Sequence, residues 1–545
     1  MAVAVALAPP PARAPASCGD DAGASCGTTV AGGGEAQAEV DEQPTGSDPG
    51  CLGDAVAPRL ALFSSPWPRA LTEIVDPIPS QRLDKSRVLV HNLLLVTSVL
   101  VTRIAVTRVL VNALRLTTLR SILSSRETRG LDIVASTPRR IGIVGAGILG
   151  LAVARRLTEL VPEAELTVVD KERDCALHQT GHNSGVMHAG VYYPQGSLKA
   201  TLCRRGIDLL KCYCDEHGVP YDECGKVIVA RDELEVPRLD EIERRARANG
   251  VPGLRRLNRT ALTEVEPHVT GVSGLHSPST AIVDFRAVAE ALAAELERSG
   301  VTVRFGFEVT AIDRSGGEIR IEDEHAGETM AFDRAVLCGG LQSDRLARLA
   351  GDGPDPVIVP FRGEYHRLLP SRSHLVRGLI YPVPDPAFPF LGVHFTRRID
   401  GTVDIGPNAV LALAREGYRR RDVSVADARD IIASPGFRRL ARRHWRVGLS
   451  EVHGSLSRRA FVAEAQTFVP ELRPPDVVPA RAGVRAQAID PDGTLVDDFR
   501  ITDAGGIIVV RNAPSPAATS SLAIAEYVAP QVLGRTPAPL PAPGE

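Results

Sequence analysis

The stretch that decides the fold is RRIGIVGAGILGLAVARRLTELVPEAELTVVDKE, residues 139–172. Its apolar run at 141–144 predicts a short buried strand, and a second run at 166–169 predicts another. Between them, apolar residues recur at helical spacing after a glycine-rich turn. A strand, a tight turn, a helix and a second strand make the β-α-β unit of a parallel sheet.

The turn has the spacing Gly145-x-Gly147-x-x-Gly150. Gly145 permits the tight turn, Gly147 lets backbone approach a pyrophosphate, and Gly150 lets the helix pack closely on the strand. The N–H groups and the positive end of the helix dipole would face the phosphates. Asp170 is placed to accept hydrogen bonds from ribose hydroxyls, and it disfavours NADP because it would repel a 2′-phosphate. The pattern predicts a bound ADP moiety, with a tight turn lacking any ligand as the alternative, and it leaves FAD and NAD open.

Length and composition narrow the class of protein. The 545 residues suffice for two or three domains or for one two-lobed enzyme, and strand and helix patterns alternate from about 139 to 530, which predicts an α/β fold. A net charge of −3 gives no reason to expect nucleic acid. The nine cysteines include no CxxC pair, so we expect no metal site and reduced thiols. No secretory signal is recognisable, and a cytoplasmic protein is expected.

The N-terminal part has a different character. Residues 1–80 are rich in Ala, Gly, Pro and Ser, which predicts a disordered extension. Residues 81–138 are apolar and basic, but the longest uncharged run, 88–102, is too short to span a bilayer. Two interpretations stay open: an amphipathic helix in peripheral contact with an anionic membrane, or an extension with no folded role. Residues 536–545 are expected to form a tail.

A polar, glycine-rich segment, HQTGHNSGVMHAG at 178–190, follows the second predicted strand. A catalytic loop, a metal site, a cofactor cradle and a polar turn are all conceivable for this composition. Its place shortly after Asp170 favours a flavin, whose ring needs donors and acceptors along its pyrimidine edge. His182, Asn183 and Ser184 can supply them, unless the last two only satisfy backbone in a turn. Covalent attachment of the flavin stays open, since three histidines lie here: His178, His182 and His188.

A longer series of segments carries a family resemblance. It runs through HQTGHNSGVMHAGVYYPQGSLKATLCRRG, HGVPYDECGKVIVA, FRGEY, FPFLGVHFTRRIDGTVDIGPNAV, GVRAQAIDPDGTLVDDF and NAPSPAATSSLAIAEY. In these segments the chain resembles the amino-acid-oxidase-like (DAO) FAD-dependent oxidoreductases, most closely the L-2-hydroxyglutarate dehydrogenases and oxidases. The resemblance covers roughly 139–530 and implies FAD as the cofactor.

The resemblance also implies an architecture: a Rossmann-like FAD-binding domain interleaved with an α+β substrate lobe on a mainly antiparallel sheet. The FAD-binding parts are expected at about 139–215, 285–355 and 480–535, and the substrate lobe at about 216–284 and 356–479. The strand at 335–338 would return to the dinucleotide sheet, and a helix capped by Ser515 or Thr519 would point at the flavin O2 region. The residues expected to hold FAD are Gly145, Ala146, Gly147, Ile148, Gly150, Asp170, Lys171, His182, Asn183, Ser184, Val309 (near the adenine), Gly339 and Ser515.

The implied reaction is oxidation of L-2-hydroxyglutarate to 2-oxoglutarate by hydride transfer from C2 to flavin N5. Two substrate carboxylates require cations, preferably arginines, and the hydroxyl proton requires a base, most often a histidine. We expect Arg485 and Arg362 to bind carboxylates, Tyr365 to orient the substrate, and His394 to act as base, with His188 as its rival.

Three further matters remain open at this stage. The substrate could be another 2-hydroxy acid, an amino acid or glycerol 3-phosphate. The electron acceptor could be a quinone or oxygen. A non-catalytic dinucleotide-binding redox sensor is the alternative of a different class.

Overall fold

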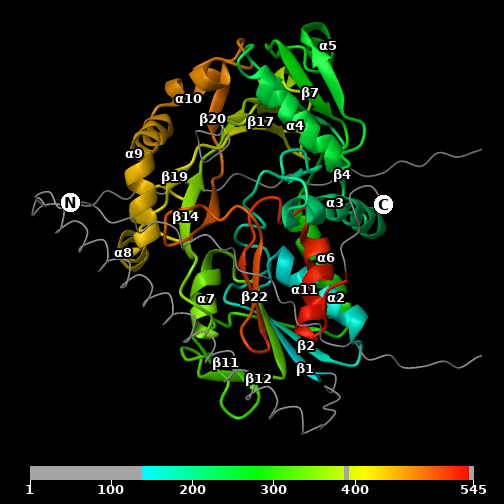
Figure 1. Cartoon of the computed structure of the whole chain (residues 1–545), viewed down its shortest axis with the longest axis vertical. Helices are drawn as coiled ribbons and strands as arrows, with labels where there is room; N and C mark the ends of the chain where they lie inside the picture. The colour runs from blue at the N-terminus through cyan, green and yellow to red at the C-terminus, as the bar shows by residue number, and fades with distance from the viewer. Residues whose placement is uncertain (1–137, 386–391, 539–545) are drawn as a thin grey trace, which may run out of the picture. The chain divides into compact units, whose positions relative to one another are not determined.

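The computed structural model describes residues 138–385 and 392–538, all within the compact unit formed by 130–545 (Figure 1). The predictions for residues 1–80, for 81–137 and for the end of the tail lie outside the described residues. Among the helices of the described ranges, none combines the length and apolar character needed to cross a membrane.

A six-stranded sheet forms the first half of the fold, in the order β22-β23-β13-β1-β2-β9. All neighbours pair in parallel except β22, which runs antiparallel at one edge. The strand predictions around 141–144, 166–169 and 335–338 are confirmed, and so is the parallel α/β class. The strands are β1 (Arg140–Val144), β2 (Glu165–Asp170), β9 (Thr302–Phe305), β13 (Arg334–Leu337), β22 (Arg500–Asp503) and β23 (Ile507–Asn512).

Both faces of this sheet are buried, which explains its nearly continuous apolar strands. Alternate residues point to opposite faces: Ile143 joins one core cluster and Val144 the other. The first face carries α2 (Ile148–Leu160), α3 (Leu198–His217), α6 (Phe285–Arg298) and α11 (Ser521–Val532). The second carries α7 (Ser343–Leu349) and a small sheet of β10 (Ala311–Asp313), β11 (Ile319–Asp323) and β12 (Glu328–Phe332).

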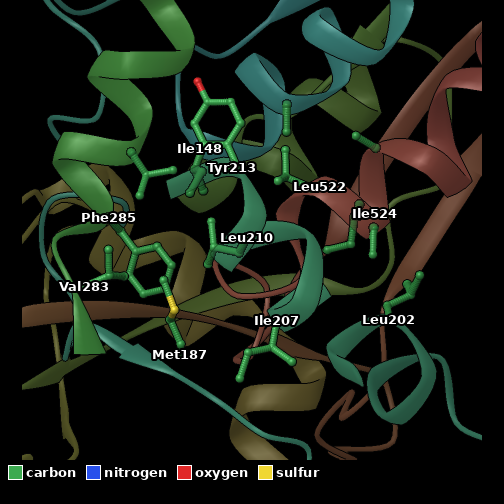
Figure 2. Packing of buried hydrophobic residues seen from close by; sticks show 14 of the residues in the cluster. Ile148, Met187, Leu202, Ile207, Leu210, Tyr213, Val283, Phe285, Leu522 and Ile524 are labelled. Atoms are coloured by element: carbon green, nitrogen blue, oxygen red, sulfur yellow. The ribbon is translucent and has the colours of Figure 1, made fainter. Parts of the chain in front are cut away.

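Helix α2 is held between α6 and α11. Figure 2 shows this packing, with Ile148 of α2, Phe285 of α6, and Leu522 and Ile524 of α11 in one cluster with Leu210 of α3. The start of α2, where the glycine turn lies, is therefore anchored by segments from the middle and from the C-terminal end of the folded chain.

The second half is built on an eight-stranded sheet, β20-β15-β18-β17-β16-β5-β7-β6. Every neighbouring pair is antiparallel except β16 with β5, so the prediction of a mainly antiparallel substrate lobe is confirmed. Its strands are β5 (Lys226–Ala230), β6 (Arg255–Asn258), β7 (Ser273–Ser277), β15 (His366–Leu368), β16 (Leu379–Pro382), β17 (His394–Arg397), β18 (Val403–Gly406) and β20 (Val477–Pro479).

A three-stranded antiparallel sheet, β19-β14-β21, adjoins this half. It contains β14 (Val357–Gly363), β19 (Val410–Leu411) and β21 (Gly483–Ile489). The segment from 480 onward was predicted to belong to the FAD-binding part, but β21 pairs along its whole length with β14. The return to the dinucleotide sheet comes later, at β22. Helices α4 (Val236–Ala248), α5 (Arg259–Val265), α8 (Val425–Ala433), α9 (Pro435–Leu456) and α10 (Arg458–Ala465) complete this half.

The loop after β19 ties the two halves together. Arg415 forms a buried ion pair with Asp344 at the start of α7, with Nη2 donating to Oδ2 at 2.9 Å. Its Nη1 also donates to the Leu341 carbonyl at 2.7 Å. The next residue, Glu416, accepts hydrogen bonds from Lys171 at 3.1 Å and from the Gln342 amide at 3.0 Å. Each charge of the buried pair is therefore compensated by the other. The pair holds the loop after β19 in a fixed position against α7.

Candidate active site

A cavity of about 1210 Å³ extends from the glycine turn to the strands of the second half. It exceeds the roughly 300–1,000 Å³ typical of a site for a drug-sized ligand, so it has room for a dinucleotide and a substrate. Gly145, Gly147 and Asp170 line one part, and His188, Tyr365 and His394 line another.

The three glycines of the turn differ in what surrounds them. Gly145 has φ +108°, and a Cβ there would lie 2.5 Å from the Cys338 carbonyl oxygen. A Cβ on Gly150 would lie 1.9 Å from the Gly145 carbonyl oxygen, so these two are needed by the protein itself. A Cβ on Gly147 would meet only the Thr180 hydroxyl, at 3.4 Å. The space beside Gly147 is therefore left for a ligand.

The start of α2 is suited to an anion. Its first residue is preceded by Gly147, which offers no side-chain cap, and the first turn holds no acidic residue. The N–H of Ile148 donates to the Thr180 hydroxyl at 3.1 Å, but helix N-termini present several unpaired N–H groups. These groups and the dipole favour a phosphate in the space beside Gly147.

Asp170 lies at the end of β2, on the cavity wall. Its Oδ2 accepts from the Ala146 N–H at 2.7 Å and its Oδ1 from the Glu172 N–H at 2.9 Å. A carboxylate has about four lone-pair sites, so it can still accept from ribose hydroxyls. Ala146 is fully buried and its N–H is used by Asp170, so its part in cofactor binding is indirect.

Three further residues that were predicted to hold FAD also line the cavity: Val309, Gly339 and Ser515. The prediction that Ser515 or Thr519 caps the last helix is wrong: α11 follows Ser520, with no side-chain cap. Ser515 instead lies 3.4 Å from His188 Nε2, and Thr519 accepts from the His188 N–H at 3.1 Å. The N–H groups of Ser520 and Ser521, at the start of α11, donate to the Pro516 and Ala518 carbonyls, and neither residue lines the cavity.

The loop at 178–190 serves partly as predicted. His182 lines the cavity, donates from Nδ1 to the His178 carbonyl at 3.0 Å and packs on the Tyr418 ring at 4.2 Å. Ser184 also lines the cavity. Asn183 lines the cavity as well, but its amide nitrogen donates to two carbonyls of the same loop and its oxygen accepts from the Gly185 N–H, so its part in holding the flavin stays a prediction. Asn183 shapes the loop as a turn residue.

One cluster on the cavity wall has the composition of a metal site. Atoms of Glu172, His178 and Glu416 lie within 4.8 Å of one another. Lys171 already supplies a cation to this cluster, since its ammonium pairs with Glu172 and lies 3.0 Å from Glu416. The group is accounted for as an ion-pair network beside the predicted cofactor residue Lys171.

The substrate end of the cavity contains two neutral histidines. His394 is buried, and its Nδ1 donates to the Gly392 carbonyl at 3.1 Å, which leaves Nε2 as an acceptor. Its ring lies 4.0 Å from that of Tyr381. Burial lowers the pKa of His394 to about 3 and that of His188 to about 3, and nearby cations act in the same direction. Both imidazoles are therefore unprotonated near neutral pH.

Behind this end lies a buried lysine that sequence reasoning missed. Lys226 is 1% exposed, and its ammonium lies 4.7 Å from the Tyr192 ring centroid and 5.2 Å from that of Tyr381. Both tyrosines line the cavity. Within the described ranges, Lys226 forms no ion pair with a carboxylate, and burial lowers its pKa to about 8. The sequence offers one signal for it: a lysine is the first residue of the otherwise apolar strand KVIVA, residues 226–230.

The Tyr192 hydroxyl is a second missed feature. It is buried and has no hydrogen-bond partner in the described part of the chain. Burial raises the pKa of Tyr192 well above its usual value, so the phenol keeps its proton. A buried hydroxyl without a partner on a cavity wall is suited to a polar substrate group.

Of the two predicted arginines, only one reaches this cavity. Arg485 and Tyr365 line it. Arg362 does not: its guanidinium pairs with Glu364 at 3.1 Å and donates to the Arg419 carbonyl at 3.2 Å, in a second cavity. The reason is register, because Arg362 stands opposite Val484 and so points to the other face of the sheet from Arg485. Contrary to the prediction, Arg362 therefore does not line this cavity.

The fold and this cavity define an FAD-dependent oxidoreductase, since the glycine turn, the uncapped start of α2 and Asp170 fit the cofactor. The sequence profile of the DAO family, described as FAD dependent oxidoreductase, matches residues 140–531, and the chain belongs to this family.

Relatives of known name agree with that assignment. The chain is 45% identical over 430 residues to the mitochondrial L-2-hydroxyglutarate dehydrogenase of Nematostella vectensis, covering 76% of this chain and 94% of that protein. It is also 45% identical to the mitochondrial enzyme of that name from Homo sapiens, covering 75% and 90%. Against the L-2-hydroxyglutarate dehydrogenase of Escherichia coli strain K12 the identity is 45%, covering 72% and 92%.

Solved structures share the fold at lower identity. An FAD-bound L-alpha-glycerophosphate oxidase from Mycoplasma pneumoniae superposes with a TM-score of 0.59 at 21% identity, covering 74% of this chain and 96% of that one. A glycine oxidase from Geobacillus kaustophilus gives 0.56 at 18% identity, covering 74% and 97%. These similarities concern the fold alone.

The space beside Gly147 generates a prediction about the cofactor. Gly147→Val should weaken FAD binding by at least about tenfold, equivalent to about 1.4 kcal/mol, because the side chain would occupy the phosphate position. The measurement is the dissociation constant for FAD titrated into apoprotein, with flavin recovered after acid precipitation as a check for covalent attachment. Gly353→Ala is the matched control, since a Cβ there meets nothing within 4 Å. Wild-type affinity in Gly147→Val would contradict the assignment.

Proposed function

We propose that this protein catalyses the FAD-dependent oxidation of L-2-hydroxyglutarate to 2-oxoglutarate. The observation that carries the proposal is identity of 45% to enzymes named for this substrate, over nearly their whole length. The cavity supports it, because it combines unprotonated histidines with cations suited to a dicarboxylate. An amine or glycerol 3-phosphate substrate is not favoured, and neither is a non-catalytic redox sensor.

We assign the roles within the site as follows. Arg485 binds a substrate carboxylate through its guanidinium, which forms bidentate hydrogen bonds with such groups. Tyr365 orients the substrate from the adjoining wall. His394 accepts the hydroxyl proton at Nε2, since its Nδ1 proton is committed to the Gly392 carbonyl. When bound, FAD would supply the hydride acceptor for the hydrogen at C2 of the substrate. His188 is the rival base, although its Nε2 already faces Ser515.

Lys226 adds an electrostatic contribution from behind the wall. A buried ammonium without an anionic partner is unfavourable, and an anionic ligand in the cavity offsets that penalty. The rings of Tyr192 and Tyr381 separate the ammonium from the cavity. We therefore assign Lys226 to attracting and positioning the dicarboxylate, without direct contact.

For the electron acceptor we favour a membrane quinone over oxygen, and with it a peripheral membrane location within the cytoplasm. A quinone requires an enzyme that reaches the bilayer surface, and helix α9, which exposes both apolar and basic side chains, offers such contact. Oxygen consumption during turnover would be negligible on this proposal, and reduction of an added ubiquinone analogue would be fast.

The substrate is tested by anaerobic flavin reduction. L-2-hydroxyglutarate should bleach the flavin absorbance rapidly, whereas D-2-hydroxyglutarate, glycerol 3-phosphate and amino acids should bleach it at least about a hundredfold more slowly, which corresponds to about 2.7 kcal/mol of discrimination. Faster bleaching by any of these compounds than by L-2-hydroxyglutarate would refute the proposed substrate.

The base is tested by His394→Asn, whose amide can still donate toward Gly392. Flavin reduction should slow by about 10²–10⁴-fold, the usual contribution of general base catalysis. Burial lowers the pKa of His394 to about 3, so the imidazole stays neutral down to that pH and the wild-type rate should show no acid limb near 6.5. His188→Asn is the comparison and should slow the reaction far less. Equal losses in the two variants, or an acid limb near 6.5, would remove His394 from this role.

Lys226→Met should weaken binding of 2-oxoglutarate by about tenfold or more, that is by at least about 1.4 kcal/mol, without destabilising the fold. The pKa of Lys226 is about 8, so its charge is lost as the pH rises through that value. Wild-type affinity should fall above pH 8, and Lys226→Met should lack this step. The measurement is the flavin spectral change on titration with 2-oxoglutarate at pH 7 and pH 9. Lys211→Met is the control, because Lys211 pairs with Glu223 away from the cavity. An unchanged pH dependence in Lys226→Met would argue against this role.

A further inference from the structure

Helix α9 presents an apolar stripe to solvent. Beyond the kink at His444, Trp445, Leu449, Val452 and Leu456 recur at helical spacing. They are exposed to 56%, 61%, 45% and 72%, respectively, values unusual for large apolar side chains aligned on one helix. The buried side of α9 is formed instead by residues such as Leu440 and Ser455.

The surroundings extend this stripe into a surface. Most of the exposed large apolar side chains in the described part of the chain lie between Leu413 and Leu456, including Val425 and Ile432 of α8. Helices α8, α9 and α10 follow one another in space, as their yellow to orange ribbons in Figure 1 show. We call this α8–α9–α10 face the apolar–basic surface.

Helix α9 and the start of α10 contribute mainly positive charge to this surface. The guanidinium of Arg446 lies 5.3 Å from the Trp445 ring centroid. The one acidic residue of α9, Glu451, accepts from the Ala409 N–H at 2.8 Å and so faces the protein, where burial raises its pKa. The exposed basic residues along α9 and the start of α10 are Arg438, Arg439, Arg442, Arg443, Arg446, Arg458 and Arg459.

We propose that the apolar–basic surface docks this enzyme on an anionic lipid bilayer. A helix with a Trp- and Leu-containing face bordered by arginines lies in the interface plane, its apolar side chains at the boundary of the acyl region and its cations among the headgroups. No helix in the described ranges could span the bilayer, so the contact is peripheral. A second copy of the chain is disfavoured as occupant, because an isologous contact would bring the two sets of arginines together with no exposed acid on α9 to compensate.

The biological purpose of this surface rests on the quinone acceptor proposed above, because docking would bring the enzyme to membrane quinones. The contact itself depends only on α9 and its neighbours. Binding and oxidation are therefore measured separately.

The test uses the full-length holoprotein and flotation with vesicles, either phosphatidylcholine alone or phosphatidylcholine with about 30% phosphatidylglycerol. Wild type should bind the anionic vesicles, less so at high salt, and bind the neutral ones weakly. Leu449→Asp and the double variant Arg442→Glu/Arg443→Glu should each lower the partition coefficient at least tenfold. Leu234→Asp is the matched control, because Leu234 is 84% exposed outside this surface, and it should bind like wild type.

Fluorescence adds a local readout. The tryptophan emission maximum should shift to the blue on addition of anionic vesicles. This shift should vanish in Trp445→Phe, which distinguishes the signal of Trp445 from that of Trp67. Wild-type partition of both α9 variants would overturn the proposal and point to another segment, such as residues 82–122. A wild-type dimer in gel filtration that Leu449→Asp converts to a monomer would overturn it too.

Oxidation of L-2-hydroxyglutarate with a soluble dye as acceptor is measured in every variant. It should equal wild type, since α9 takes no part in the cavity. Absence of dye-coupled oxidation in the wild-type protein would refute the proposed function, but it would not affect the conclusion on membrane docking.

Discussion

The buried ion pair between Arg415 and Asp344 is the interaction on which the geometry of the site depends. The phosphate-binding turn belongs to the first half of the fold, and Arg485 and His394 belong to the strands of the second. The cavity lies between them, so its width is set by what joins the halves. Removing one member of such a buried pair typically costs about 3–5 kcal/mol, because the other charge is left without a partner.

The electrostatics at the substrate end follow from burial. Desolvation disfavours charge, so His188 and His394 stay neutral and able to accept a proton, while the pKa of Lys226 falls. Arg485 adds a guanidinium, whose planar fork suits carboxylates. The wall thus combines neutral bases with cations that a dicarboxylate can stabilise, an arrangement that selects for an anionic substrate.

How much of this was predictable depends on how local each feature is. The β1-turn-α2-β2 unit was predicted because its pattern lies within one short stretch, and the segments of the family resemblance indicated the substrate lobe. The exclusion of Arg362 was not predictable, because it depends on the register of β14 with β21, which decides which face each side chain takes. Asn183 could be assigned only once its loop carbonyls were placed. Lys226 escaped notice because only the fold brings it against Tyr192 and Tyr381.

The order of the dinucleotide sheet has a consequence for how the molecule is made. Strand β23, the last in the sequence, lies next to β13 inside the sheet, and α11 packs on α2, the helix of the first turn. These pairings join residues far apart along the chain, and such non-local contacts slow folding. During synthesis the edge of β13 stays unpaired until residues 507–512 have been made. Until then its backbone N–H and C=O groups are free to pair with the wrong strand. The dinucleotide sheet, and with it the binding cleft, is therefore completed only after residues 507–512 have left the ribosome.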